Sequence, residues 1–158
     1  MQFLEWLQFS ALGTFVAENL YAYPVLETLH VLGMAVLVGV LSLINLRVLG
    51  YKRELPLVGT RQLLPLAWGG FTVNLITGAA LFSSDAVYFF DSWTFRIKIL
   101  LIILGGINAA VLSSRIFQQQ VADGGDVELA PGMKWVAASS LVFWTGAILA
   151  GRLVAYLP

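Results

Sequence analysis

Four long apolar stretches divide the chain, and shorter polar or charged segments separate them. They run over residues 25–46, 63–82, 93–112 and 135–157. An α-helix needs about 20 apolar residues to cross the hydrocarbon core of a bilayer, and each stretch is about that long. The pattern predicts an all-α integral membrane protein, a four-helix bundle formed by a single transmembrane domain over residues 1–158.

The segment before the first span is amphipathic. Over residues 2–20, apolar side chains such as Phe3, Leu7 and Phe15 share one broad side, with Glu5 and Glu18 away from it. The pattern predicts an N-terminal helix lying in the membrane interface; the alternative is a helix packed against the bundle. Residues 83–91 and 113–133 are predicted to be loops.

Composition agrees with a membrane location and limits the chemistry. Hydrophobic residues make up 59% of the chain and charged residues only 11%, against about 25% charged in soluble domains. The formal net charge is zero, so nothing points to nucleic acid. The absence of cysteine excludes disulfides, iron–sulfur clusters and covalently attached haem. The N-terminus lacks the basic region of a cleaved signal peptide.

Basic residues predict the orientation. Six of the nine fall in two segments, 47–61 and 113–134, which a four-span topology places on the same side. Positive charge favours the cytoplasmic side. We therefore predict a multi-pass protein of the bacterial inner membrane, with both termini on the periplasmic side.

This topology predicts one polar layer near the outer face. His30, the only histidine, and Lys98 and Arg152 lie on three different spans, each about 7–9 Å below the outer boundary at about 1.5 Å per residue. Glu27 and Arg96 lie about one turn higher. Ionisable groups inside a membrane are costly, which makes them functional candidates.

Haem is one interpretation of this layer. His30 would bind the iron, and Gly33 would let the porphyrin approach the first span. Arg96, Lys98 and Arg152 would balance the propionates, and Glu27 would support the imidazole or pair with a cation. Met34 lies one turn from His30 on the same helix, so it cannot reach the opposite face of the haem.

Other interpretations stay open at this point. Glu27, His30, Lys98 and Arg152 would equally form a buried salt-bridge network that fixes helix register, and Arg152 would otherwise snorkel outward. Copper has few ligands to draw on.

Small residues suggest where helices approach closely. Gly70, Asn74 and Gly78 recur every four residues in the second span, and Gly146 to Gly151 offer a second such face. These faces would serve helix packing or a homo-oligomer. Asn74 and Asn108 are expected to hydrogen-bond between helices.

Several stretches resemble a family of small bacterial four-helix membrane proteins of unknown function. They are YPVLETLHVLG, NLRVLG, ITGAALF, FRIKILLIILGGINA and AGRLVAYL, spread over residues 20–157. The family pattern has Asp where this chain has Asn45. More distantly, the layout is similar to that of single-histidine membrane protoporphyrinogen oxidases and of copper-resistance membrane domains, and Leu29-His30 and Trp93 to Lys98 stand where the oxidases have such segments.

The oxidase resemblance implies b-type haem at His30. The leading hypothesis is a haem b protein that transfers electrons or senses redox state near the outer face, with an unidentified redox partner. The alternatives are a non-redox structural, assembly or transport-associated subunit, and a protoporphyrinogen oxidase-like enzyme.

Overall fold

The computed structural model describes residues 1–51, 62–123 and 132–157, and the side chains of these ranges except 116–123. Lys52, Arg53 and Arg61, which helped to predict the orientation, lie outside the described residues. So does the turn expected at Gly124-Gly125.

Every regular element in the described ranges is an α-helix. The helices are α1 (Gln2–Gln8), α2 (Ala11–Glu18), α3 (Ala22–Val48), α5 (Leu64–Ser84), α6 (Ala86–Asp91), α7 (Trp93–Asp123) and α8 (Gly132–Leu153). Four of them, α3, α5, α7 and α8, are long and apolar enough to cross a membrane. The prediction of an all-α chain with four helices of this kind is confirmed.

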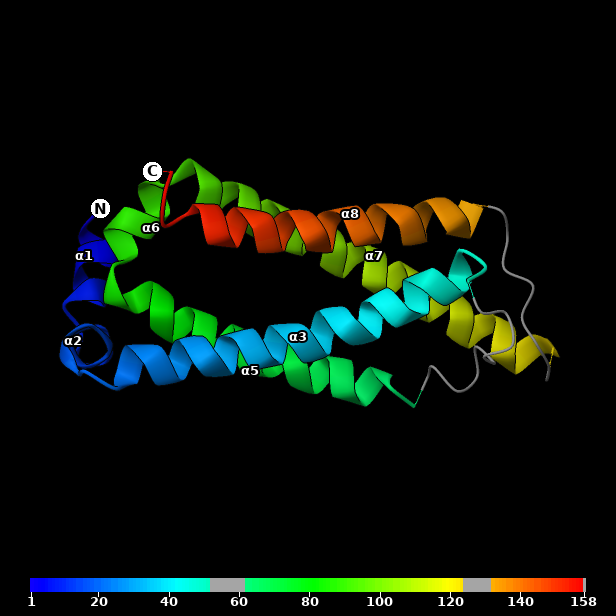
Figure 1. Ribbon diagram of the computed structural model, residues 1–158, viewed down its shortest axis with the longest axis horizontal. Helices are drawn as coiled ribbons and strands as arrows, with labels where there is room; N and C mark the ends of the chain where they lie inside the picture. Colours follow the sequence, from blue (N-terminus) through cyan, green and yellow to red (C-terminus); the bar gives the residue numbers. More distant parts are fainter. Residues whose placement is uncertain (52–61, 124–131, 158) are drawn as a thin grey trace.

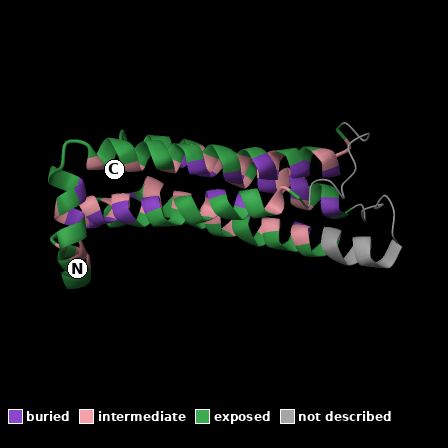
Figure 2. Cartoon of the chain, turned by 90° about the horizontal axis from the view of Figure 1, so that it is seen from below, coloured by how far each residue is buried: buried purple, intermediate pink, exposed green. Residues whose placement is uncertain are grey.

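The long helices run side by side as two pairs (Figure 1). α3 packs against α5 and α7 packs against α8, while α3 and α8 form the main direct contact between the pairs. The pairs diverge toward the end that carries both chain termini. Exposed residues cover the outward faces of the long helices (Figure 2), where a bilayer would contact them.

Two glycines bring α3 and α5 into backbone contact. A Cβ atom on Gly70 would lie 2.8 Å from the carbonyl oxygen of Gly33 and 3.0 Å from the amide nitrogen of Leu37. Only glycine allows this approach, as expected for helix packing in membranes. The small-residue face predicted on the second span is therefore used within the chain.

The half of the structure away from the termini is solidly packed. Its core joins apolar side chains of all four long helices: Leu37, Val40, Leu41, Ile44, Val48, Ala67, Leu112, Met133, Ala137 and Trp144. The buried Asn45 amide donates to the Ser140 hydroxyl across α3 and α8, at 3.0 Å. On the other side of α8, Asn108 donates to Ser139 at 2.8 Å, which confirms the interhelical bond predicted for it. Asn74 instead bonds Gly70 of its own helix.

Short helices close the end that carries the termini. α2 packs on α5, and α6 connects α5 to α7. The amide of Val87 in α6 donates to the Gln8 side chain at the end of α1, at 3.2 Å. The Tyr88 hydroxyl donates to the Val154 carbonyl just after α8, at 2.9 Å. These bonds join both ends of the chain to α6.

Three predicted boundaries are wrong. Residues 2–20 form two helices because Ser10 caps α2, its hydroxyl oxygen accepting from the Gly13 amide. The loop predicted over 83–91 contains α6. The loop predicted from Ser113 is helical to Asp123, since no glycine or proline interrupts the helix before Gly124.

The glycine contact gives a matched test. We expect Gly70→Ala to destabilise the protein by about 1–3 kcal/mol, because the new methyl group meets backbone atoms of α3 that cannot turn aside. Gly69→Ala is the control, since nothing lies within 4 Å of its Cβ position. It should be neutral or stabilise by up to about 1 kcal/mol through helix propensity. Unfolding in mixed micelles with increasing dodecyl sulfate, followed by circular dichroism, measures both; equal stability of the two variants would contradict the packing.

Candidate functional site

A cavity of about 410 Å³ lies among the four long helices, in the half of the structure toward the termini. Its polar lining residues are His30, Asn74, Lys98 and Trp144, and the others are apolar. No acidic residue lines it. The cavity begins where the core ends, since Leu37 and Trp144 belong to both. Its size falls within the range of roughly 300–1,000 Å³ found for pockets that bind small molecules and cofactors.

α5 fixes the imidazole of His30 from one side. Nδ1 lies 2.9 Å from the hydroxyl oxygen of Thr77. That hydroxyl donates its own proton to the Val73 carbonyl at 2.7 Å, so its oxygen is free to accept from Nδ1–H. The backbone carbonyl of Asn74 is a further acceptor beside the ring. In neutral His30, the proton therefore resides on Nδ1, and Nε2 carries the lone pair.

Gly78 makes room for this ring. A Cβ atom on Gly78 would lie 3.1 Å from Cε1 of His30 and 3.6 Å from Nδ1. The Nδ1–Cε1 edge of the imidazole therefore faces α5, and Nε2 is the ring nitrogen left to bind a ligand. In histidines that bind metals, the ring nitrogen that does not bind the metal commonly donates a hydrogen bond of this kind, which orients the ring.

Lys98 brings the second polar group to the cavity, from α7. A Cβ atom on Gly151 would lie 3.4–3.5 Å from Cδ, Cε and Nζ of Lys98, so the lysine stem lies across the glycine surface of α8. Nζ lies 5.8 Å from the ring centroid of Phe95. Among the described residues, no carboxylate forms an ion pair with this ammonium group.

Aromatic rings bound the cavity at its end toward α6. Phe82 of α5 and Phe95 of α7 stack with centroids 5.4 Å apart, and Phe89 of α6 packs against both. Phe82 and Phe95 also line the cavity. Trp144 contributes apolar surface, because its buried Nε1 lies against Gly105 and has no hydrogen-bond partner among the described residues.

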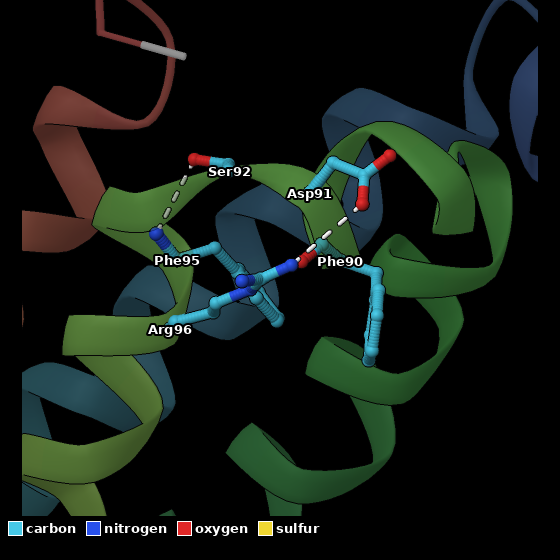
Figure 3. A network of polar contacts seen from close by, with 5 residues as sticks. All are labelled: Phe90, Asp91, Ser92, Phe95 and Arg96. Carbon is cyan, nitrogen blue, oxygen red and sulfur yellow. Dashed lines mark hydrogen bonds and ion pairs between the residues drawn. The ribbon is translucent and has the colours of Figure 1, made fainter.

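Arg96 lies apart from the cavity, at the corner between α6 and α7 (Figure 3). Its Nε donates to the Phe90 carbonyl at 2.8 Å, and its guanidinium is 3.7 Å from the Asp91 carboxylate. The guanidinium carbon also lies 5.2 Å from the ring centroid of Phe90 and 5.4 Å from that of Trp93. These contacts hold Arg96 at the helix corner, where its side chain is 44% exposed.

Three other predicted site residues also lie outside the cavity lining. Arg152 and Glu27 are exposed, and Gly33 is buried against Gly70 in the contact between α3 and α5. Of the six predicted residues, the structure brings only His30 and Lys98 to the cavity. In the described ranges, no ion pair joins Glu27, His30, Lys98 and Arg152 into the alternative network.

Sequence reasoning missed Thr77, the residue in direct contact with Nδ1 of His30. Thr77 adjoins Gly78, which belongs to the small-residue face predicted on the second span. That face was the feature of the sequence that could have pointed to Thr77. Phe82 and Phe95 were missed because aromatic residues near helix ends are expected to contact the membrane interface. No group of three or more histidine, cysteine or acidic side chains suited to a metal ion occurs in the part of the chain that the structure describes. A metal at His30 would therefore need further ligands that do not come from such a group of side chains, for example the nitrogen atoms of a porphyrin.

Comparisons with protein-family models, with curated proteins and with solved structures found no match. The resemblances in the sequence thus stay predictions, and the site is interpreted from its own geometry.

The single histidine makes the proposed tautomer measurable. We expect ¹⁵N-histidine NMR of the protein in micelles, at a pH where His30 is neutral, to show the proton on Nδ1. Thr77→Val keeps the side-chain shape but removes the acceptor, so the Nδ1–H signature should weaken and stability should fall by about 1–3 kcal/mol. Thr77→Ser should restore the signature.

Thr72→Val is the matched control for this experiment. Its exposed hydroxyl bonds only the Trp68 carbonyl of the same helix, so the variant should leave the imidazole spectrum unchanged. An Nε2–H tautomer in the unmodified protein would contradict the assignment.

Proposed function

We propose that the chain is a b-type haem-binding membrane protein with His30 as the axial iron ligand. The observation that carries the proposal is an imidazole, oriented by Thr77, on the wall of an apolar cavity of about 410 Å³. Haem would supply one-electron redox chemistry when bound. The protein's part is to hold the plate, orient the ligand and keep water away.

The two nitrogen groups of the cavity call for different partners. Nε2 of His30 offers a lone pair, so it suits an electron-pair acceptor such as iron. The ammonium group of Lys98 offers only N–H donors, so it suits an anion such as a carboxylate. A quinone fits less well, because its carbonyl oxygens would use the donors of Lys98 and Asn74 and would leave the lone pair of Nε2 without a partner. Haem combines an apolar plate, an electron-accepting metal and carboxylates in one molecule.

The cavity favours a smaller site than the sequence predicted. Lys98 is the cation that lines it, so we assign one propionate to Lys98. Arg96 is engaged by Phe90 and Asp91 at the helix corner, and Arg152 is exposed. The second propionate would then face the aqueous side. Thr77 is the residue in hydrogen-bond contact with the imidazole, the role that was expected for Glu27.

The membrane arrangement is part of the same proposal. We propose that α3, α5, α7 and α8 form a four-helix bundle in the bacterial inner membrane, with α1 and α2 in the outer interface and both termini on the periplasmic side. Electron exchange would then occur with a partner near that face. Exposed Phe3 and Trp6, with Phe9 directly after the helix, suit α1 to an interface. Self-association stays a prediction, because glycines of α5 and α8 pack inside the chain.

An optical spectrum tests the proposal. The protein purified from haem-replete cells should show a Soret band, with α and β bands after reduction by dithionite, and His30→Ala should lose them. Lys98→Met should retain the iron ligand but weaken haem affinity about 10- to 100-fold, the effect of losing one charge-assisted hydrogen bond of about 1.5–3 kcal/mol.

Arg96→Met and Arg152→Met are the matched controls for Lys98→Met, since neither arginine lines the cavity. Both should bind haem as the unmodified protein does. A colourless, folded protein that gains no Soret band on titration with haemin would reject haem binding and favour the non-redox alternative.

A further inference from the structure

We infer that the cavity exchanges its ligand directly with the lipid phase, through a portal between α5 and α7. The portal is defined by Leu75 and Ala79 of α5 and Ile99 of α7. Among the residues that line the cavity, these three are the exposed ones, and the others are buried or partly buried. The identity of the ligand rests on the proposed function, whereas the route rests on the packing alone.

Two long sides of the cavity are closed by helices in tight contact. Between α3 and α5, the backbones meet at Gly33 and Gly70. Between α7 and α8, the Trp144 indole lies against Gly105, and a Cβ atom on Gly146 would be 3.1 Å from Leu101. Neither side leaves space for a ligand to pass.

The third side and both ends carry no exposed lining residue. α3 and α8 contact each other in the core, at the Asn45–Ser140 bond, and the residues with which these two helices line the cavity are buried or partly buried. The end toward the termini is covered by α6 and by the rings of Phe82, Phe89 and Phe95. The opposite end is the packed core.

The side between α5 and α7 is different. These two helices are bridged by α6 and by the stacked rings of Phe82 and Phe95. Beyond this bridge, toward the core, the cavity lining includes the exposed side chains of Leu75, Ala79 and Ile99. Both helices are candidate membrane spans, so the portal opens at the level of acyl chains.

The chemistry of the route agrees with the chemistry of the cavity. The portal carries three apolar side chains, which favour entry of an apolar plate or chain from lipid. The ionisable groups, His30 and Lys98, and the Asn74 amide lie on the cavity wall. The expected ligand class is a membrane-dissolved amphiphile with an anionic group, of which haem is the member that also uses the lone pair of Nε2.

Narrowing the portal should slow passage in both directions. We would compare Ala79→Phe with Ile76→Phe on the same helix; Ile76 is 63% exposed and does not line the cavity. The uptake rate is measured from the growth of the Soret band after haem-free protein in nanodiscs is mixed with haemin-loaded vesicles. The release rate is measured from the transfer of haem to apomyoglobin. Ala79→Phe should slow uptake and release by about tenfold each, equivalent to about 1.4 kcal/mol of added barrier.

Ile76→Phe should exchange haem at the unmodified rate. Equal rates in the two variants would overturn the portal while leaving haem binding in place, because the ligand would then enter elsewhere, such as through the end covered by α6. Weaker affinity with an unchanged uptake rate would also overturn it, since residue 79 would then be part of the binding surface only.

A second measurement tests the portal if the protein binds no haem at all. Trp144 is kept as the single tryptophan by replacing the other four, all exposed, with phenylalanine. Lipids with brominated acyl chains should quench Trp144 fluorescence by entering the cavity. An acyl chain in the cavity would lie through the portal, because its headgroup stays outside, so quenching should fall in Ala79→Phe and persist in Ile76→Phe. Equal quenching in both variants would overturn the lipid route whatever the ligand is.

Discussion

The contact between Gly33 and Gly70 is the constraint on which the rest of the structure depends. It brings the backbones of α3 and α5 together, and one helical turn before Gly33 the same approach places His30 against Thr77 and Gly78. In a membrane, water does not drive helices together, so close packing and interhelical hydrogen bonds must hold them. The glycine contact therefore determines both the pairing of these helices and the orientation of the only imidazole.

The structure divides its length between a packed core and a cavity. Away from the termini, all four long helices share one apolar core, and the Asn45–Ser140 hydrogen bond joins α3 to α8 within it. Toward the termini, the helix pairs diverge and α6 bridges the gap. A cavity inside a bundle costs packing energy. Its presence beside an oriented histidine is therefore more consistent with a bound ligand than with a purely structural role.

The basic residues of α7 show how one helix places two cations in different surroundings. Arg96 and Lys98 are two positions apart, so they face different sides of the helix. Arg96 turns to the corner with α6, where a backbone carbonyl, a carboxylate and two aromatic rings surround it. Lys98 turns inward across Gly151. Similar depth in the membrane thus does not imply a shared site.

The sequence by itself determined the four long helices and the similar depth of His30 and Lys98, because apolar length and position along a span are local properties. It did not determine α6, the break at Ser10 or the length of α7, since short caps and helix ends depend on few residues. Only the tertiary structure decided that Thr77 supports His30 and that Glu27, Gly33, Arg96 and Arg152 lie outside the cavity. The physical reason is rotational: hydropathy gives the depth of a side chain, whereas packing between helices decides which way it faces.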